Sequence, residues 1–275
     1  MLIDGRALAQ ELNIRTKQRV ENLKFQPLLV DIVVGSDPAS LSYVKIKEKK
    51  ALEVGLAFEL HQLPENSTTA EVIELIAKLA QRARLCGLII QLPLPGHIDT
   101  RAVLDAVPNQ IDVDVLNSES NKKFYSGENT LVPPTAGAIL HILDSLSEDW
   151  QSKKFLVVGR GDLVGKPIAY LLQERGLRVK TADRSTEDLS GLLQQADCVI
   201  SGAGKPDLIQ GQDIQQDAIV IDAGTSEANG SITGDVHTSS VEPKTKYLTP
   251  VPGGVGPLTV AKLLENVVAV AESRD

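Results

Sequence analysis

Residues 154–175, KFLVVGRGDLVGKPIAYLLQER, place an apolar strand directly before a glycine-rich turn and a helix. Gly159, Gly161 and Gly165 follow the spacing G-x-G-x-x-x-G, which is one residue longer than the usual dinucleotide fingerprint. Such glycines let a pyrophosphate approach the backbone N–H groups at a helix N-terminus. An ordinary strand–turn–helix connection is the alternative, but the flanking elements favour a Rossmann-like dinucleotide-binding domain.

The end of the next expected strand carries Asp183 and Arg184, 24 residues after Gly159. This separation is close to that of the residue that contacts the adenosine ribose in dinucleotide folds. Asp183 suits the free ribose hydroxyls of NAD, whereas Arg184 and Arg160 suit the 2′-phosphate of NADP. Because two cations stand against one anion, we expect NADP, with NAD as the alternative.

Strand-like and helix-like segments alternate along almost the whole chain, which predicts an α/β fold built of βαβ units. The expected strands cover residues 27–34, 56–63, 87–90, 153–158, 177–181, 198–201 and 218–222. The expected helices cover residues 5–23, 38–53, 135–146, 164–175 and 258–272, with a further helix that begins after Ser67 and Thr68. A polar stretch at residues 118–129 places the domain boundary near residues 115–135.

The composition sets limits on the class of protein. The 275 residues carry 28 Lys and Arg against 36 Asp and Glu, a formal net charge of −8. This length favours two domains, and the acidic balance argues against nucleic-acid binding. No apolar run is long enough for a membrane helix, and Asp4 and Arg6 disfavour a secretory leader. Cys86 and Cys198 lie too far apart for a disulfide framework or a zinc motif, so we expect a cytoplasmic protein without a metal site.

A lysine-rich helix in the first half carries a candidate proton-transfer group. Tyr43 and Lys47 are four residues apart and therefore share one face of the expected helix at 38–53. Crowded lysines favour an uncharged amine suited to acid–base work, although most such helices are simply solvated basic faces. Gln91 lies at the carboxyl end of an expected buried strand, directly before the loop with Pro93 and Pro95. Ligands of open α/β sheets bind at such strand ends. The alternative is that Gln91 only terminates the strand.

Two further segments have unusual patterns. Asp112 and Asp114 alternate with Val113, so at most one of the two carboxylates points into a given site, and a surface turn is the simpler interpretation. Residues 249–257, TPVPGGVGP, cannot form a regular strand or helix and offer a stiff backbone to a flat ligand. Pro257 suits the first turn of the last helix.

Taken together, these motifs resemble the methylenetetrahydrofolate dehydrogenase/cyclohydrolase family over essentially the whole chain. The matching residues are Tyr43-Val44 and Lys47, the QLPLP of residues 91–95, Asp112-Val113-Asp114, the turn at 159–167 and TPVPGGVGP at 249–257. QLPLP and TPVPGGVGP in one chain are highly specific. The resemblance implies two βα domains around a cleft, the second Rossmann-like, with the C-terminal helix packed back on the first.

The resemblance also implies a function and its residues. The family oxidises methylenetetrahydrofolate with NADP and hydrolyses the methenyl product to formyltetrahydrofolate, as a cytoplasmic homodimer in one-carbon metabolism and purine biosynthesis. Residues 1–132 plus 257–275 would form the folate-binding catalytic domain, and residues 133–256 the NADP-binding domain. The implied catalytic residues are Lys47 as the proton shuttle, Gln91, Tyr43 and Asp114. The implied substrate-binding residues are Ser40, Tyr43, Gln91, Leu92, Pro93, Asp114, Gly254 and Val255. The implied cofactor-binding residues are Gly159, Arg160, Gly161, Gly165, Lys166, Pro167, Arg184 and Thr225.

The chain departs from the family pattern at several positions. Ile111 and Val115 flank the aspartates where the family usually has lysine and glycine, and a valine loses the glycine's freedom to adopt positive φ. Pro-Pro-Thr-Ala at residues 133–136 stands for the usual Pro-Cys-Thr-Pro, Gly161 for a common serine and Asp183 for a common histidine. We therefore expect activity with altered folate affinity. The alternatives are a catalytically weakened folate- or nucleotide-binding homologue and an NAD(P) dehydrogenase of another small substrate.

Overall fold

The computed structural model describes residues 1–128, 130–228 and 231–275. The chain folds into two compact units. One unit comprises residues 11–134 and 260–275, and the other comprises residues 1–10 and 135–259. Among the described residues, no helix is long and apolar enough to cross a membrane.

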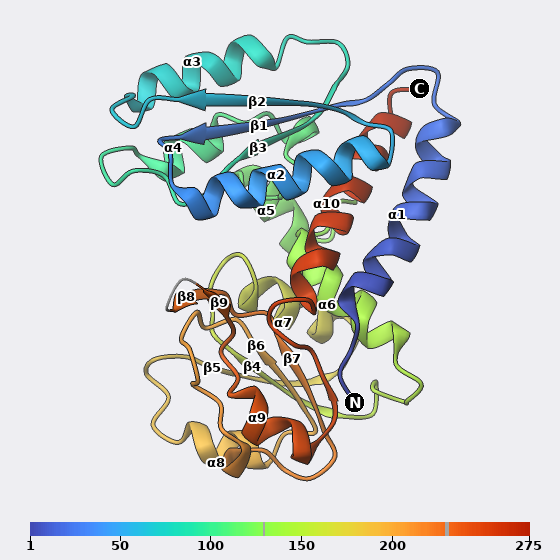
Figure 1. The fold of residues 1–275 in the computed structure, drawn as a ribbon, viewed down its shortest axis with the longest axis vertical. Helices are drawn as coiled ribbons and strands as arrows, with labels where there is room; N and C mark the ends of the chain where they lie inside the picture. The colour runs from blue at the N-terminus through green and yellow to red at the C-terminus, as the bar shows by residue number, and fades with distance from the viewer. Residues whose placement is uncertain (129, 229–230) are drawn as a thin grey trace. The chain divides into compact units, whose positions relative to one another are not determined.

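The unit of residues 11–134 and 260–275 is built on a parallel three-stranded sheet in the order β2-β1-β3. Its strands are β1 (Leu28–Val34), β2 (Ala57–Leu63) and β3 (Leu85–Ile90). Helices α2 (Pro38–Glu53) and α3 (Thr69–Leu79) lie on opposite faces of the sheet (Figure 1). The chain order reverses at β1, so the carboxyl ends of β1 and β3 form a switch point of the kind that binds ligands.

Local signals in the sequence fix both helices. Asp37 caps α2 by accepting from the backbone N–H of Ser40, and Pro38 occupies its first turn. Thr68 and Glu71 form a capping box at the start of α3. Alternate residues of β1, namely Leu28, Val30, Ile32 and Val34, share one hydrophobic core with Val72, Ile76 and Leu79 of α3. The opposite residues of β1 therefore point to the other face of the sheet.

The remaining elements of this unit are shorter or lie at the chain ends. They are α4 (Thr100–Asp105), η1 (Asn109–Ile111), α5 (Ser118–Tyr125) and most of α1 (Gly5–Glu21) and α10 (Val255–Glu272). The last residues of the chain pack within this unit, as expected from the family pattern: Asn266 donates to the carbonyls of Val113 and Val132, and Arg274 to that of Leu85.

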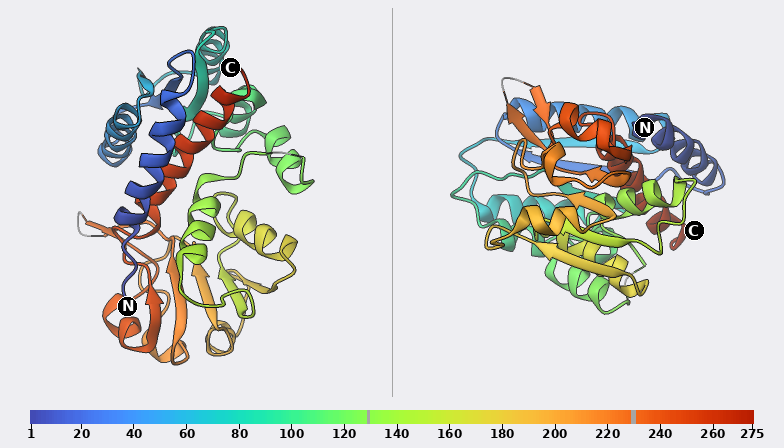
Figure 2. Two further views of the ribbon diagram at one scale, coloured as in Figure 1. Left: turned by 90° about the vertical axis from the view of Figure 1, so that its right-hand side faces the viewer. Right: turned by 90° about the horizontal axis from the view of Figure 1, so that it is seen from below.

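The unit of residues 1–10 and 135–259 is built on a parallel five-stranded sheet in the order β10-β7-β6-β4-β5, whose strands lie side by side in Figure 2. They are β4 (Lys154–Val158), β5 (Arg178–Ala182), β6 (Cys198–Ser201), β7 (Ala218–Asp222) and β10 (Thr245–Leu248). The helical elements are α6 (Pro134–Ser145), α7 (Gly165–Glu174), α8 (Leu189–Gln194), η2 (Gly211–Asp213), α9 (Thr238–Val241) and η3 (Glu242–Lys244). Strands β8 (Ser226–Ala228) and β9 (Ser231–Thr233) form a separate hairpin. The chain order reverses at β4, as in Rossmann-like folds.

Two elements have no counterpart among the expected helices and strands. The polar stretch at 118–129 contains α5, which is capped by Asn117 and buries Phe124. Strand β10 pairs with β7, which is more than twenty residues earlier in the sequence, so no local periodicity indicates this pairing.

Candidate functional site

Lys47 is the centre of a buried polar cluster in the unit with the three-stranded sheet. It lies on α2 and exposes only 2% of its surface. Its Nζ donates to Oε1 of Gln91 at 2.8 Å. Gln91 directly follows β3, and its own Nε2 donates to the carbonyl of Leu92 at 2.8 Å, which orients Oε1 toward the amine. The structure therefore brings Lys47 and Gln91 together, as the motif pattern implied.

Asp31, which sequence reasoning did not single out, completes this cluster. Its Oδ2 lies 2.5 Å from Nζ of Lys47, and the residue is fully buried within β1. The expected crowding of Lys47 by other lysines is therefore wrong, because its nearest charged neighbour is a carboxylate. The available signal was one charged residue inside the apolar run LLVDIVV.

Tyr43 and Asp114 lie beside the amine. The ring centroid of Tyr43 is 5.4 Å from Nζ of Lys47. Tyr43 exposes 37% of its surface, yet burial of its polar end, followed by the carboxylates of Asp114 and Asp31, raises the pKa of Tyr43. Burial likewise raises the pKa of Asp114 to about 7, and Asp112 and Asp31 act in the same direction, whereas Lys47 opposes them. Asp114 is thus a carboxylate whose charge changes near neutral pH.

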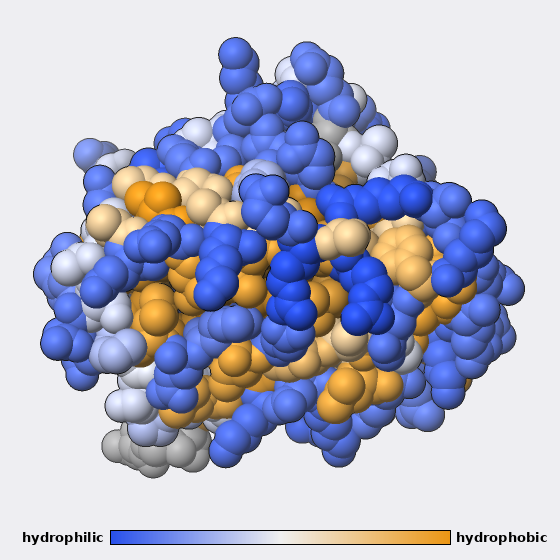
Figure 3. All heavy atoms as spheres, turned by 90° about the horizontal axis from the view of Figure 1, so that it is seen from above, coloured by the Kyte–Doolittle hydropathy of each residue, from blue (hydrophilic) through white to orange (hydrophobic). Residues whose placement is uncertain are grey.

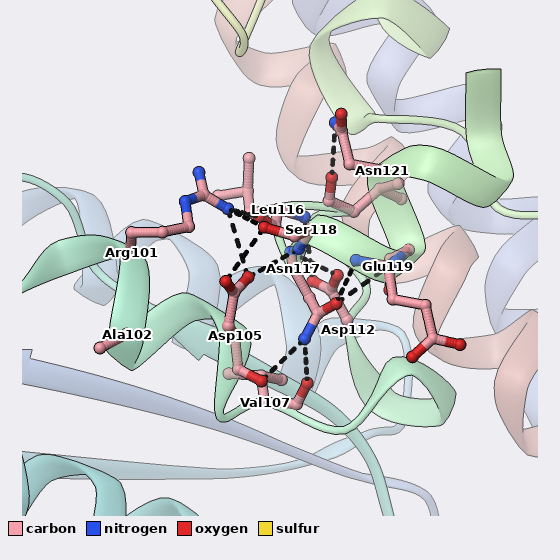
Figure 4. A network of polar contacts seen from close by, with 12 residues as sticks. Arg101, Ala102, Asp105, Val107, Asp112, Leu116, Asn117, Ser118, Glu119 and Asn121 are labelled. Carbon is pink, nitrogen blue, oxygen red and sulfur yellow. Dashed lines mark hydrogen bonds and ion pairs between the residues drawn. The ribbon is translucent and has the colours of Figure 1, made fainter.

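A hydrogen-bond network holds the loop that carries Asp114 (Figure 4). Asp112 accepts from the backbone N–H groups of Leu116 and Asn117 at 3.2 and 2.9 Å. The side chain of Asn117 donates to the carbonyls of Asp105 and Val107 at 2.9 and 3.1 Å. Asp112 therefore supports the loop, which agrees with the expectation that only one of the two carboxylates faces a site.

Val115 has an unfavourable backbone conformation in this loop. Its φ is +60°, in the left-handed region that a β-branched residue rarely adopts, and its side chain is fully buried. The family's usual glycine meets this requirement without strain. The substitution therefore places backbone strain next to Asp114.

The other expected substrate-binding residues lie in both units. Ser40 is buried in the first turn of α2, and Leu92 and Pro93 follow β3 and are joined by a cis peptide bond. Gly254 and Val255 belong to the other unit, at the start of α10. A Cβ on Gly254 would lie 2.7 Å from the carbonyl oxygen of Pro250, so only glycine fits there.

The expected nucleotide turn connects β4 to α7. Gly159 has φ of +98°, and a Cβ there would lie 2.6 Å from the carbonyl oxygen of Gly202. A Cβ on Gly165 would lie 1.9 Å from the carbonyl oxygen of Gly159. These two glycines let the turn pass close to the end of β6, which leaves the N-terminus of α7 available to a phosphate. Gly161, in contrast, faces open space.

The polar side chains around this turn suit a phosphorylated ligand. Arg160 and Arg184 are exposed, and Arg160 lies 3.5 Å from Asp183. Hydrogen bonds from Ser185, supplemented by Arg160, keep the pKa of Asp183 below its ordinary value. Lys166 is exposed and pairs with Asp162 at 2.6 Å. Of the remaining expected contacts, Pro167 is buried in α7 and Thr225 is exposed after β7. The glycine cradle and the basic side chains fit a dinucleotide.

Comparisons with known proteins agree with both halves of this description. The family model "Tetrahydrofolate dehydrogenase/cyclohydrolase, catalytic domain" matches residues 3–114, and "Tetrahydrofolate dehydrogenase/cyclohydrolase, NAD(P)-binding domain" matches residues 133–275. The bifunctional protein FolD of Exiguobacterium sibiricum is 38% identical over 275 residues, which cover 99% of each chain. That of Moorella thermoacetica is 39% identical over 274 residues and 98% of each chain.

Two solved structures of the same kind superpose closely. The bifunctional FolD enzyme of Campylobacter jejuni gives a TM-score of 0.96 at 35% identity, covering 100% of this chain and 99% of that one. The Trypanosoma brucei methylenetetrahydrofolate dehydrogenase-cyclohydrolase, solved with NADP and an inhibitor, gives 0.94 at 32% identity, covering 100% and 98%.

Proposed function

This chain belongs to the tetrahydrofolate dehydrogenase/cyclohydrolase family, and from that premise we propose that the cluster around Lys47 carries its folate chemistry. The enzyme oxidises methylenetetrahydrofolate to methenyltetrahydrofolate with NADP and hydrolyses the product to formyltetrahydrofolate in one-carbon metabolism. The match of both domain models sets aside an unrelated dehydrogenase of another small substrate. The observation that carries the proposal is the buried amine of Lys47, oriented by Gln91 beside Asp114.

NADP binds at the turn between β4 and α7 in this proposal. Gly159 and Gly165 give the pyrophosphate access to the backbone N–H groups, and Gly161, Lys166 and Pro167 complete the turn and the first turn of the helix. Arg184 and Arg160 attract the 2′-phosphate, and Thr225 follows the neighbouring β7. When bound, NADP supplies the hydride acceptor for the oxidation step.

The folate ring binds beside Asp114. Ionised Asp114 accepts hydrogen bonds from the amino and ring N–H groups of the pterin, a bidentate match for a carboxylate. Tyr43 packs against the ring, and Ser40, Leu92 and Pro93 of the same unit supply further contacts. Gln91 orients Lys47 through a hydrogen bond. Because its amide is neutral, it does not form an ion pair with the cationic methenyl intermediate that would slow hydrolysis.

Hydrolysis requires a group that removes a proton from water and returns one to a folate nitrogen. Lys47 is suited to this task because its amine is almost completely buried and is held in place by a hydrogen bond to Gln91. Overall, methenyltetrahydrofolate and water give formyltetrahydrofolate and one proton. In this proposal the folate-binding part comprises residues 1–132 plus 257–275, and the cofactor-binding part comprises residues 133–256. The compact units differ from this division, because residues 1–10 and 257–259 belong to the unit with the five-stranded sheet and residues 133 and 134 to the other. The buried free thiols of Cys86 and Cys198 support a cytoplasmic location.

We also propose a homodimer that forms through the open edge of β2. β2 is an outer strand of its sheet, and Leu60 on this strand exposes 41% of its surface. Ile46 and Leu52 of α2 are exposed as well. Figure 3, viewed from the side of α3 and β2, shows hydrophobic surface among the polar side chains. An outer strand presents unpaired backbone N–H and C=O groups, and two copies of β2 related by a two-fold axis would satisfy these groups by antiparallel pairing.

Spectrophotometric assays of the two steps test the catalytic proposal. We expect Lys47→Met to lose hydrolysis of methenyltetrahydrofolate while it still binds NADP. Lys45→Met is the matched control, because Lys45 lies on the same helix but is exposed. Undiminished hydrolysis in Lys47→Met would exclude Lys47 as the proton shuttle, and binding of both ligands without any turnover by the unaltered protein would indicate a catalytically weakened homologue.

A further inference from the structure

β1 carries one carboxylate among six buried apolar residues. Asp31 lies in the middle strand of the sheet, where it pairs with Leu60 and Ile89. Transfer of a carboxylate from water into such a strand is unfavourable unless a cation neutralises it. Lys47 is that cation, and within the described part of the chain neither oxygen of Asp31 accepts a hydrogen bond from any other residue. The other residues of the strand therefore do not stabilise a carboxylate at this position, whereas the ion pair with Lys47 does.

The contacts of Lys47 define what Asp31 can do. An ammonium has three protons to donate. Nζ donates to Oε1 of Gln91 at 2.8 Å and forms an ion pair with Oδ2 of Asp31 at a nitrogen–oxygen distance of 2.5 Å. We propose that Asp31 is a positioning residue that shares a proton with Lys47 and so holds the hydrolytic amine in a buried pair of zero net charge. This inference rests on the proposed role of Lys47 in hydrolysis.

Zero net charge matters because the compound to be hydrolysed is a cation. An uncompensated ammonium at Lys47 would repel it, whereas the pair with Asp31 does not. Transfer of a proton from Nζ to Oδ2 leaves a neutral amine and a neutral carboxyl group, so the base is formed without a change in total charge. Burial raises the pKa of Asp31 against the attraction of Lys47, which is consistent with a carboxyl group that can take this proton.

The proton balance of hydrolysis then closes. The water oxygen bonds to the methenyl carbon, one water proton goes to Nζ, and the positive charge passes from the folate to Lys47. In the second step the bond from this carbon to one folate nitrogen breaks, and that nitrogen takes the proton from Nζ. The hydroxyl proton leaves to solvent as the formyl C=O forms. One proton is thus released in each turnover, and the neutral pair is restored.

Other titratable groups face the same amine. Tyr43 lies on α2, and Asp114 lies in the loop after η1 with Asp112 behind it. Asp112 is fixed by backbone N–H groups, and the pKa of Asp114 is about 7. The effect of Asp31 is therefore also measured in an Asp114→Asn background, where the titration of Asp114 is removed.

The test is the pH profile of methenyltetrahydrofolate hydrolysis, corrected for the enzyme-free rate, in Asp31→Asn and Asp31→Val. In the unaltered enzyme the pair supplies the neutral amine by proton transfer to Oδ2, whereas in both variants the ammonium must first lose its proton to solvent. The acidic limb of kcat therefore moves to higher pH by about one to three pH units in both variants. At pH values below that limb, the KM for the cationic methenyl substrate rises, because the charge on Lys47 is no longer compensated. Glu48→Gln, which removes an exposed carboxylate from the same helix, leaves both unchanged.

The outcomes separate this inference from the proposed function. If both Asp31 variants lose rate but keep the acidic limb of the unaltered enzyme, Asp31 has a structural role only and the inference is wrong. Asp31→Val matches the apolar neighbours of the strand, so it provides the answer if Asp31→Asn does not fold. Full hydrolysis by Lys47→Met would instead overturn the role of Lys47 itself.

Discussion

Replacement of Val115 tests whether its backbone conformation carries strain. A non-glycine residue in the left-handed region lowers the free energy of unfolding by about 1–2 kcal/mol. Val115 is in this region, because its φ is +60°. At a buried position with ordinary backbone angles, a change from alanine to glycine lowers the free energy of unfolding in two ways. The loss of one buried carbon contributes about 0.8 kcal/mol, and the greater conformational entropy of glycine in the unfolded chain contributes about 0.5–1 kcal/mol. At Val115 the relief of strain offsets this sum. We therefore expect Val115→Gly and Val115→Ala to be almost equally stable.

Val113 is the matched control for this experiment. It lies two residues earlier in the same loop and is also fully buried, but it is not among the described residues with positive φ. There, Val113→Gly should be less stable than Val113→Ala by about 1.3–1.8 kcal/mol, the sum of the same two contributions. Urea unfolding followed by far-UV circular dichroism measures all four variants. An equal penalty for the change from alanine to glycine at both positions would refute the assignment of strain to Val115.

The same variants test the consequence for folate binding. The side chain of Val115 is fully buried, so it does not occupy open space where the folate would bind, which argues against the altered folate affinity expected from the sequence. We expect Val115→Gly to keep the KM of the unaltered enzyme for methylenetetrahydrofolate. A large fall in KM would show instead that the valine obstructs the pterin and that this departure from the family pattern weakens substrate binding.

Four further predictions concern the cofactor, pH and assembly. Arg184→Ala should weaken binding of NADP by roughly tenfold and leave NAD unaffected in titrations with each cofactor, and equal losses would place the 2′-phosphate elsewhere. Affinity for methylenetetrahydrofolate should increase as the pH rises through about 7, because Asp114 then ionises, and Asp114→Asn should abolish this dependence. Because the pKa of Asp114 is about 7 in the folded state and 3.8 in the unfolded state, the folded protein binds this proton more tightly. The free energy of unfolding should therefore decrease as the pH rises from 3.8 to about 7. Leu60→Glu should give a monomer in light scattering, and a dimer that persists would place the interface elsewhere.

Much of the fold follows from local features of the sequence. The helix expected over 38–53 is confirmed as α2, because Asp37 and Pro38 mark its start without help from distant residues. The turn between β4 and α7 was recognisable because the positive φ of Gly159 and the close approach at Gly165 require glycine. Such signals depend only on residues near in the chain, so a single sequence contains them.

The chemistry of the site depends on contacts that spacing does not encode. The motif pattern identified Lys47, Gln91 and Asp114 as candidates, but the sequence alone suggested an amine crowded by other lysines. The tertiary structure instead places Asp31 from a neighbouring strand within 2.5 Å of that amine. The charge state of a buried group is determined by whatever packs around it, and only the packing of α2 against β1 decides that a carboxylate does so.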